Sequence, residues 1–86
     1  MTIELRLPNL DLPGTAITAT CWHAQIGQRV IEGDRLLEIL AGDAIVDLPA
    51  PANGRLVERT VQTDDVLHAG QILALTAESV ERPRAE

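Results

Sequence analysis

The sequence predicts a small all-β domain in which two sheets pack on a thin aliphatic core. Three observations support this prediction: short apolar runs with the period of strands, turn residues between these runs, and an internal repeat with a spacing of 37 residues. No longer segment keeps the 3.6-residue period of a helix without Gly or Pro, so no helix beyond one turn is expected. A chain of 86 residues has room for one such core.

The expected strands are short and bounded by turn residues. Residues 3–7 alternate strictly between apolar and polar, which indicates a strand with one buried face. The Gly-Asp pair at 42–43 lies between two apolar runs and is typical of a tight hairpin, because Gly adopts positive φ without steric cost. We place the domain at residues 1–77 and expect the charged tail, residues 78–86, to fray. Strands are expected at 3–7, 17–24, 29–31, 36–41, 44–48, 55–61, 65–67 and 72–77.

The internal repeat predicts two similar halves related by a pseudo-twofold axis. Each half holds about four short strands and cannot bury a face alone, so the halves must pack on each other. Asp64 falls where the first half has Gly27, and Asp visits the left-handed region more readily than most residues. A shift of 37 residues places Gly27 on Asp64, Val30 on Leu67, Gly33 on Gly70, Leu36 on Leu73 and residues 17–22 on 54–59.

Composition argues against several classes of function. Thirteen acidic residues against seven basic ones give a net charge of −6, which opposes the basic surface that nucleic-acid binding needs. Trp22 is the single aromatic residue, so platforms for stacking bases are missing. No apolar run approaches the length of a membrane span, and the first residues lack a signal-peptide pattern. We therefore expect a cytoplasmic protein that binds neither nucleic acid nor membrane.

Residues with reactive or metal-binding side chains are few and scattered. Cys21 stands alone, and a single thiol in a strand is more often a packed residue than a redox or metal site. His23 and His68 are not equivalent in the repeat, and no metal-ligand spacing joins them to carboxylates. Trp22 is expected to be a packing anchor or a half-buried wall at one end of the barrel. No nucleophile or acid–base pair is visible, so we expect no metal site and no enzyme activity from the chain alone.

Several spaced motifs carry a resemblance to a known family. In one register they are Leu7–Leu10, Trp22, Gly27–Val30, Gly33–Ile39, Pro49–Gly54 and Gly70–Leu73. With these motifs the chain resembles, over about residues 3–77, the lipoyl/biotinyl carrier family, in particular the lipoyl domains of 2-oxo acid dehydrogenase acyltransferases. The resemblance implies a barrel-sandwich hybrid, a flattened barrel of two four-stranded antiparallel sheets, which agrees with the strands and the repeat.

The resemblance also implies where a carrier lysine would stand. In the lipoyl family a hairpin turn reading Asp-Lys-Ala presents a lysine whose amine takes the lipoyl group by amide linkage. The corresponding tip here consists of Ala41, Gly42, Asp43 and Ala44, so Asp43 takes the lysine position and Gly42 replaces the family's Asp. All seven basic residues are arginine, whose guanidinium stays protonated and is no acyl acceptor. The biotin carrier variant, with methionines beside its lysine, fits less well because Met1 is the only Met. We therefore predict no lipoyl or biotinyl cofactor.

Three functions remain open on this resemblance. The first is a non-catalytic docking or assembly module of a 2-oxo acid dehydrogenase-like multienzyme system, whose acidic hairpin, with Asp43 and Asp47, is the recognition surface. The second is a decayed or altered lipoyl acyl-carrier domain, for which a lysine at position 43 in the genomic sequence would decide. The third is a fragment of a membrane-fusion adaptor. That family interrupts the same barrel with a long helical hairpin, whereas this chain has a tight turn there.

Overall fold

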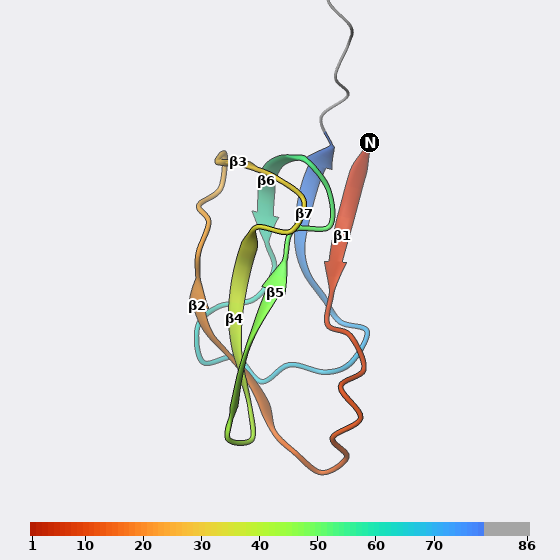
Figure 1. The fold of residues 1–86 in the computed structure, drawn as a ribbon, viewed down its shortest axis with the longest axis vertical. Coiled ribbons are helices and arrows are strands. Elements are labelled where there is room, and N and C mark those ends of the chain that lie inside the picture. The colour runs from red at the N-terminus through yellow and green to blue at the C-terminus, as the bar shows by residue number, and fades with distance from the viewer. Residues whose placement is uncertain (79–86) are drawn as a thin grey trace, which may run out of the picture.

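The computed structural model describes residues 1–78, and this part of the chain is built from strands and turns. Among these residues there is no helix long and apolar enough to cross a membrane. The predicted tail lies outside the described residues, apart from its first residue, Glu78, which ends the last strand. The strands, shown in Figure 1, are β1 (Thr2–Arg6), β2 (Ile17–Trp22), β3 (Arg29–Val30), β4 (Arg35–Ala41), β5 (Ala44–Pro49), β6 (Gly54–Arg59) and β7 (Ile72–Glu78).

The strands form two antiparallel sheets, which confirms the predicted fold class. The larger sheet has the order β1-β7-β6-β3 and the smaller one the order β2-β4-β5. The eighth strand expected at 65–67 is reduced to a single antiparallel bridge between Thr18 and Val66 on the free side of β2. The reason is that tight turns at 62–65 and 68–71 leave only Val66 and Leu67 extended between them. The Leu67 N–H still donates to the Ile17 carbonyl oxygen at 2.7 Å, so the segment closes that side of the sheet.

The predicted repeat is visible in four turns of one geometry. In each turn the third residue has a positive φ, and the side-chain oxygen of the fourth accepts a hydrogen bond from the backbone N–H of the first. Asp64, with a φ of 75°, stands where the first half has Gly27, with a φ of 91°. The sequence shift of 37 residues therefore describes the backbone as well. The four turns are Gln25–Gln28, Ile31–Asp34, Gln62–Asp65 and His68–Gln71.

Reciprocal backbone hydrogen bonds join the two halves. The Gly27 N–H donates to the Leu56 carbonyl oxygen at 2.7 Å, and the Asp64 N–H donates to the Ala19 carbonyl oxygen at 2.7 Å. The 37-residue shift relates the two donors, Gly27 and Asp64, to each other. It also relates the two acceptors, Ala19 and Leu56, so the two bonds are equivalent. Each half therefore ties its own turn to a strand of the other half, as a pseudo-twofold axis requires.

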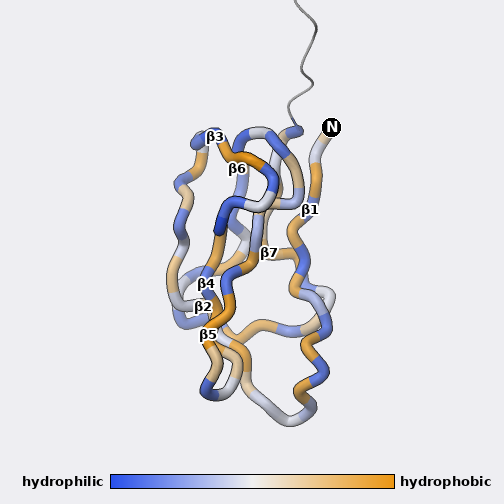
Figure 2. Tube along the Cα trace, in the orientation of Figure 1, coloured by the Kyte–Doolittle hydropathy of each residue, from blue (hydrophilic) through white to orange (hydrophobic). Residues whose placement is uncertain are grey.

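The core lies between the two sheets and consists of aliphatic side chains. Polar and apolar residues are mixed along the strands that surround it (Figure 2). Leu36 and Leu37 are consecutive yet both fully buried, because the β4–β5 register shifts between Arg35 and Leu37. Leu73 and Ala74 repeat this arrangement in β7. Burial of one such leucine is worth about 1.5–3 kcal/mol. The largest fully buried side chains are Leu7, Leu36, Leu37, Ile39, Leu56, Leu73 and Thr76.

Candidate functional site

The candidate site is the tip of the β4–β5 hairpin. Ala41 pairs with Ala44, so the connecting turn contains only Gly42 and Asp43. Gly42 has a φ of 61° whereas Asp43 does not enter the positive region, which is the pattern of a type II′ turn. The positive φ predicted for Gly42 is thus confirmed. Asp43 is exposed, and the tip lies at the end of the molecule remote from the N-terminus (Figure 1).

The loop between β1 and β2 braces this tip. The Gly42 N–H donates to the Ala16 carbonyl oxygen at 3.3 Å. A Cβ atom added to Gly42 would lie 3.1 Å from the Cγ2 methyl of Thr15. The turn is therefore held from one side, as well as by the hydrogen bonds of its own hairpin, and Asp43 is presented on a supported backbone.

Next to the tip, the hairpin exposes a pair of apolar side chains. Leu40 in β4 and Ile45 in β5 are direct cross-strand partners, so their side chains share one face. They are 37% and 68% exposed. The tip therefore offers a partner two kinds of contact: the carboxylate of Asp43 and an adjoining apolar pair.

Asp47, the second member of the predicted acidic surface, lies away from the tip. It pairs across the strands with Glu38, and its Oδ1 is 3.1 Å from Nε2 of His23. Its Oδ2 is 3.6 Å from a guanidinium nitrogen of Arg35. Sequence reasoning missed this cluster because its members lie 15 and 9 residues apart in the chain. Strand pairing across β2, β4 and β5 is the signal that could have found it.

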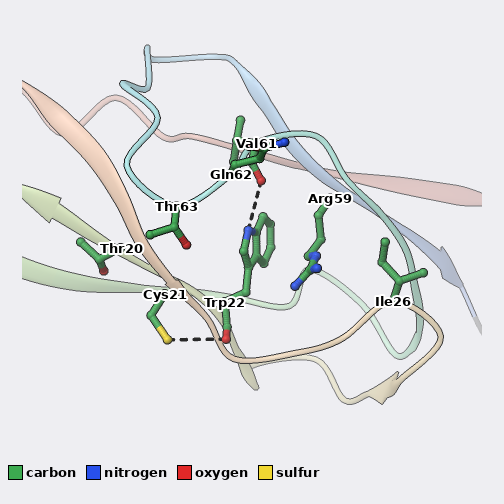
Figure 3. A pocket seen from close by; sticks show the side chains of 8 residues that line it. All are labelled: Thr20, Cys21, Trp22, Ile26, Arg59, Val61, Gln62 and Thr63. Carbon is green, nitrogen blue, oxygen red and sulfur yellow. Dashed lines mark hydrogen bonds between the residues drawn. The ribbon is translucent and has the colours of Figure 1, made fainter.

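Trp22 forms a wall of a surface groove at one side of β2 (Figure 3). Its indole Nε1–H donates to the Val61 carbonyl oxygen at 3.1 Å, and the ring packs half-buried against the core. The position agrees with the half-buried wall that was predicted. The groove is lined by Thr20, Cys21, Trp22, Ile26, Arg59, Val61, Gln62 and Thr63.

The expectation that Cys21 is packed was wrong, because the thiol is exposed. The register of β2 with β4 shifts between Ala19 and Cys21, which adds one residue to β2. Without this bulge Cys21 would point the same way as the fully buried Ala19. The bulge turns the thiol outward, where its Sγ lies 3.6 Å from the Trp22 carbonyl oxygen.

Comparison with known proteins assigns the chain to a family. Residues 4–75 match the Biotin_lipoyl family, which is described as "Biotin-requiring enzyme". The chain belongs to this family. The match confirms the resemblance drawn from the spaced motifs. Lipoyl/biotinyl domains are non-catalytic carrier modules of multienzyme complexes.

Individual relatives agree with this assignment. The chain is 27% identical, over 96% of its length, to the dihydrolipoyllysine-residue acetyltransferase component of the Corynebacterium glutamicum pyruvate dehydrogenase complex. It spans 12–16% of the length of the curated relatives it matches. The lipoyl domain of the Azotobacter vinelandii 2-oxoglutarate dehydrogenase complex is similar over 90% of this chain and 99% of that one, with a TM-score of 0.72 and 22% identity. The structure of a single-chain, multi-domain long-chain acyl-CoA carboxylase is also similar, with a TM-score of 0.76 and 22% identity. The similar region covers 93% of this chain and 7% of the carboxylase chain.

Proposed function

We propose that this domain is a docking or assembly module of a 2-oxo acid dehydrogenase-like multienzyme system and carries no lipoyl or biotinyl group. The hairpin tip is the observation that supports this. Asp43 sits on an exposed two-residue turn. The resemblance to the lipoyl domains assigns the family's lysine to this position. The 86 residues contain no lysine elsewhere that could substitute.

The chemistry of attachment supports the absence of a cofactor. Amide linkage of a lipoyl or biotinyl carboxyl group needs an amine, and a carboxylate such as Asp43 offers none. Arg35, the one arginine of the hairpin, lies at the opposite end of β4 from the turn and bears a guanidinium that stays protonated. A ligase that reaches this tip would therefore find no acceptor.

The surface of the tip supports protein docking. Charged groups on an interface set partner choice and association rate, and the exposed Asp43 supplies such a charge. Leu40 and Ile45 add apolar area that a partner can cover. The partner that fits is a subunit with a basic residue beside an apolar pocket. The relatives, which are components of 2-oxo acid dehydrogenase complexes, favour a subunit of that kind of assembly.

The experiment measures binding of the domain to the purified dehydrogenase component encoded in the same genome, by biolayer interferometry at two salt concentrations. Asp43→Arg should slow association about tenfold at low salt, and Ile45→Ser should speed dissociation. Glu58→Arg is the matched control, because it makes the same charge change at an exposed site on β6 of the other sheet. No binding, or an equal effect of the control, would contradict docking through the tip.

The two alternative functions differ from this proposal at the same tip. Membrane-fusion adaptors insert a long helical hairpin into the barrel, whereas β4 and β5 are joined here by two residues. A decayed carrier would share every feature of the fold. It differs in history, and a lysine at position 43 in the genomic sequence would decide in its favour.

A further inference from the structure

Strand pairing brings three metal-ligand side chains together on the outer face of the smaller sheet. Glu38 in β4 pairs with Asp47 in β5 and with Cys21 in β2. His23 lies two residues beyond Cys21, and its N–H donates to the Leu36 carbonyl oxygen at 2.8 Å. Because side chains alternate along a strand, His23 shares the face of Glu38 and Asp47. This cluster is separate from the hairpin tip and from the groove beside Trp22.

The distances within the cluster suit a metal ion. One ligand atom from each of His23, Glu38 and Asp47 lies within 4.8 Å of the others. His23 Nε2 and Asp47 Oδ1 are 3.1 Å apart. Two ligands of a tetrahedral zinc ion, at bond lengths of about 2.0–2.2 Å, lie about 3.3–3.5 Å apart, so this hydrogen-bonded pair would need to separate only slightly to share an ion. The Glu38 carboxylate would complete the set by rotating to within bonding distance of the same ion.

Charge and hydrogen bonding around the cluster favour a bound cation. Glu38 and Asp47 are direct cross-strand partners of like charge, an arrangement that is unfavourable without a counter-ion. Arg35 offsets it only weakly, because its nitrogen is 3.6 Å from Asp47 and its side chain is 70% exposed. Thr20 Oγ1 donates to Glu38 Oε2 at 2.8 Å and thereby orients that carboxylate, as second-layer partners of metal ligands do.

We propose that His23, Glu38 and Asp47 form a binding site for a divalent transition-metal ion, with zinc as the best fit. One imidazole nitrogen and two carboxylate oxygens are ligands that zinc accepts, and three protein ligands leave a fourth position for water or for a partner's side chain. The bound ion would join β4 and β5 to the end of β2. It would stabilise the sheet whether or not the domain docks through its tip.

Calorimetric titration of the tag-free chain with zinc chloride tests the proposal, together with thermal melting. We expect one ion per chain, and a rise in Tm of about 6–11 °C at ten times the Kd. The conservative variants His23→Gln, Glu38→Gln and Asp47→Asn should each weaken zinc binding by about tenfold or more. His68→Gln removes the chain's only other histidine and should leave the affinity unchanged.

Two further variants separate the site from general effects on folding. Arg35→Gln should tighten zinc binding, because it removes a competing cation, and a misfolded chain would not produce such a gain. Cys21→Ser tests the neighbouring thiol and should bind zinc as the parent does. The proposal is overturned if no heat or Tm shift appears at millimolar zinc, or if the three ligand variants bind as tightly as the parent. Binding that disappears only in Cys21→Ser would overturn it as well.

Discussion

The Arg59 guanidinium carbon lies 5.6 Å from the centre of the Trp22 ring, and these two residues occupy equivalent positions in the two halves of the chain. The pseudo-twofold axis therefore places the only aromatic side chain beside its own symmetry counterpart. The first half contributes the ring, and the second half contributes the cation and the Val61 carbonyl oxygen that accepts the indole N–H. This contact joins the halves at the edge of the core (Figure 3).

We expect Trp22→Ala to lower the free energy of unfolding by about 2–3 kcal/mol. That is less than the cost of a fully buried tryptophan, because the ring is half-buried. Arg59→Ala should cost at most about 1 kcal/mol, since it removes only the cation–π contact. Urea denaturation of both variants provides the comparison. Unchanged stability of Trp22→Ala would mean that the ring does not pack against the core.

The turn residue Asp64, which has a positive φ, offers a position for a stabilising substitution. Asp64 has a φ of 75° at the position where the first half has Gly27. Asp64→Gly should raise the free energy of unfolding by about 0.5–1 kcal/mol, because glycine adopts this conformation without strain. Gly27→Ala, the reciprocal change in the other half, should lower it by about 1 kcal/mol. Thermal melting measures both, and a less stable Asp64→Gly chain would argue against the equivalence of the two turns.

A buried hydroxyl in β7 offers a second position for a stabilising substitution. Thr76 is fully buried, and its Oγ1 has no hydrogen-bond partner. The 37-residue shift makes its position equivalent to that of Ile39 in the first half. Thr76→Val keeps the shape and removes the unsatisfied hydroxyl, so it should stabilise the domain by about 1 kcal/mol. Thr76→Ser, which keeps the hydroxyl and loses the methyl group, should be destabilising. Chemical denaturation distinguishes these results, and a destabilised Thr76→Val would mean that the hydroxyl is satisfied in solution.

At the hairpin tip, Gly42→Val should destabilise the domain by about 1–2 kcal/mol. The positive φ resists a β-branched residue, and the added Cβ would press on the Thr15 methyl. Asp43→Val is the neighbouring control, which should change stability by no more than about 0.5 kcal/mol because Asp43 is exposed and has no positive φ. Melting temperatures of the two variants check this. Equal effects would contradict the type II′ geometry.

Most of the fold could be predicted from the sequence, because strand period, turn residues and repeat all point to one architecture. What could not be predicted depends on register. The bulge that exposes Cys21 inserts one residue into β2 and reverses the face on which the thiol lies. The cluster of His23, Glu38 and Asp47 exists only once three strands pair, and no spacing along the chain indicates it. The two-residue turn with Asp43 was predictable, since a tight turn is a local feature.

We propose that Asp43 stands at the lysine position of a carrier hairpin. Intact-mass spectrometry after incubation with a lipoate ligase, lipoate and ATP tests this. The wild-type chain should keep its unmodified mass, since it offers no lysine. Asp43→Lys should gain a lipoyl group slowly. Gly42→Asp/Asp43→Lys should gain it faster, because residues 42–44 then have the complete Asp-Lys-Ala sequence of the family's turn. A double variant that folds like the parent yet stays wholly unmodified would contradict the claim, as would a wild-type chain that gains the mass of a lipoyl group.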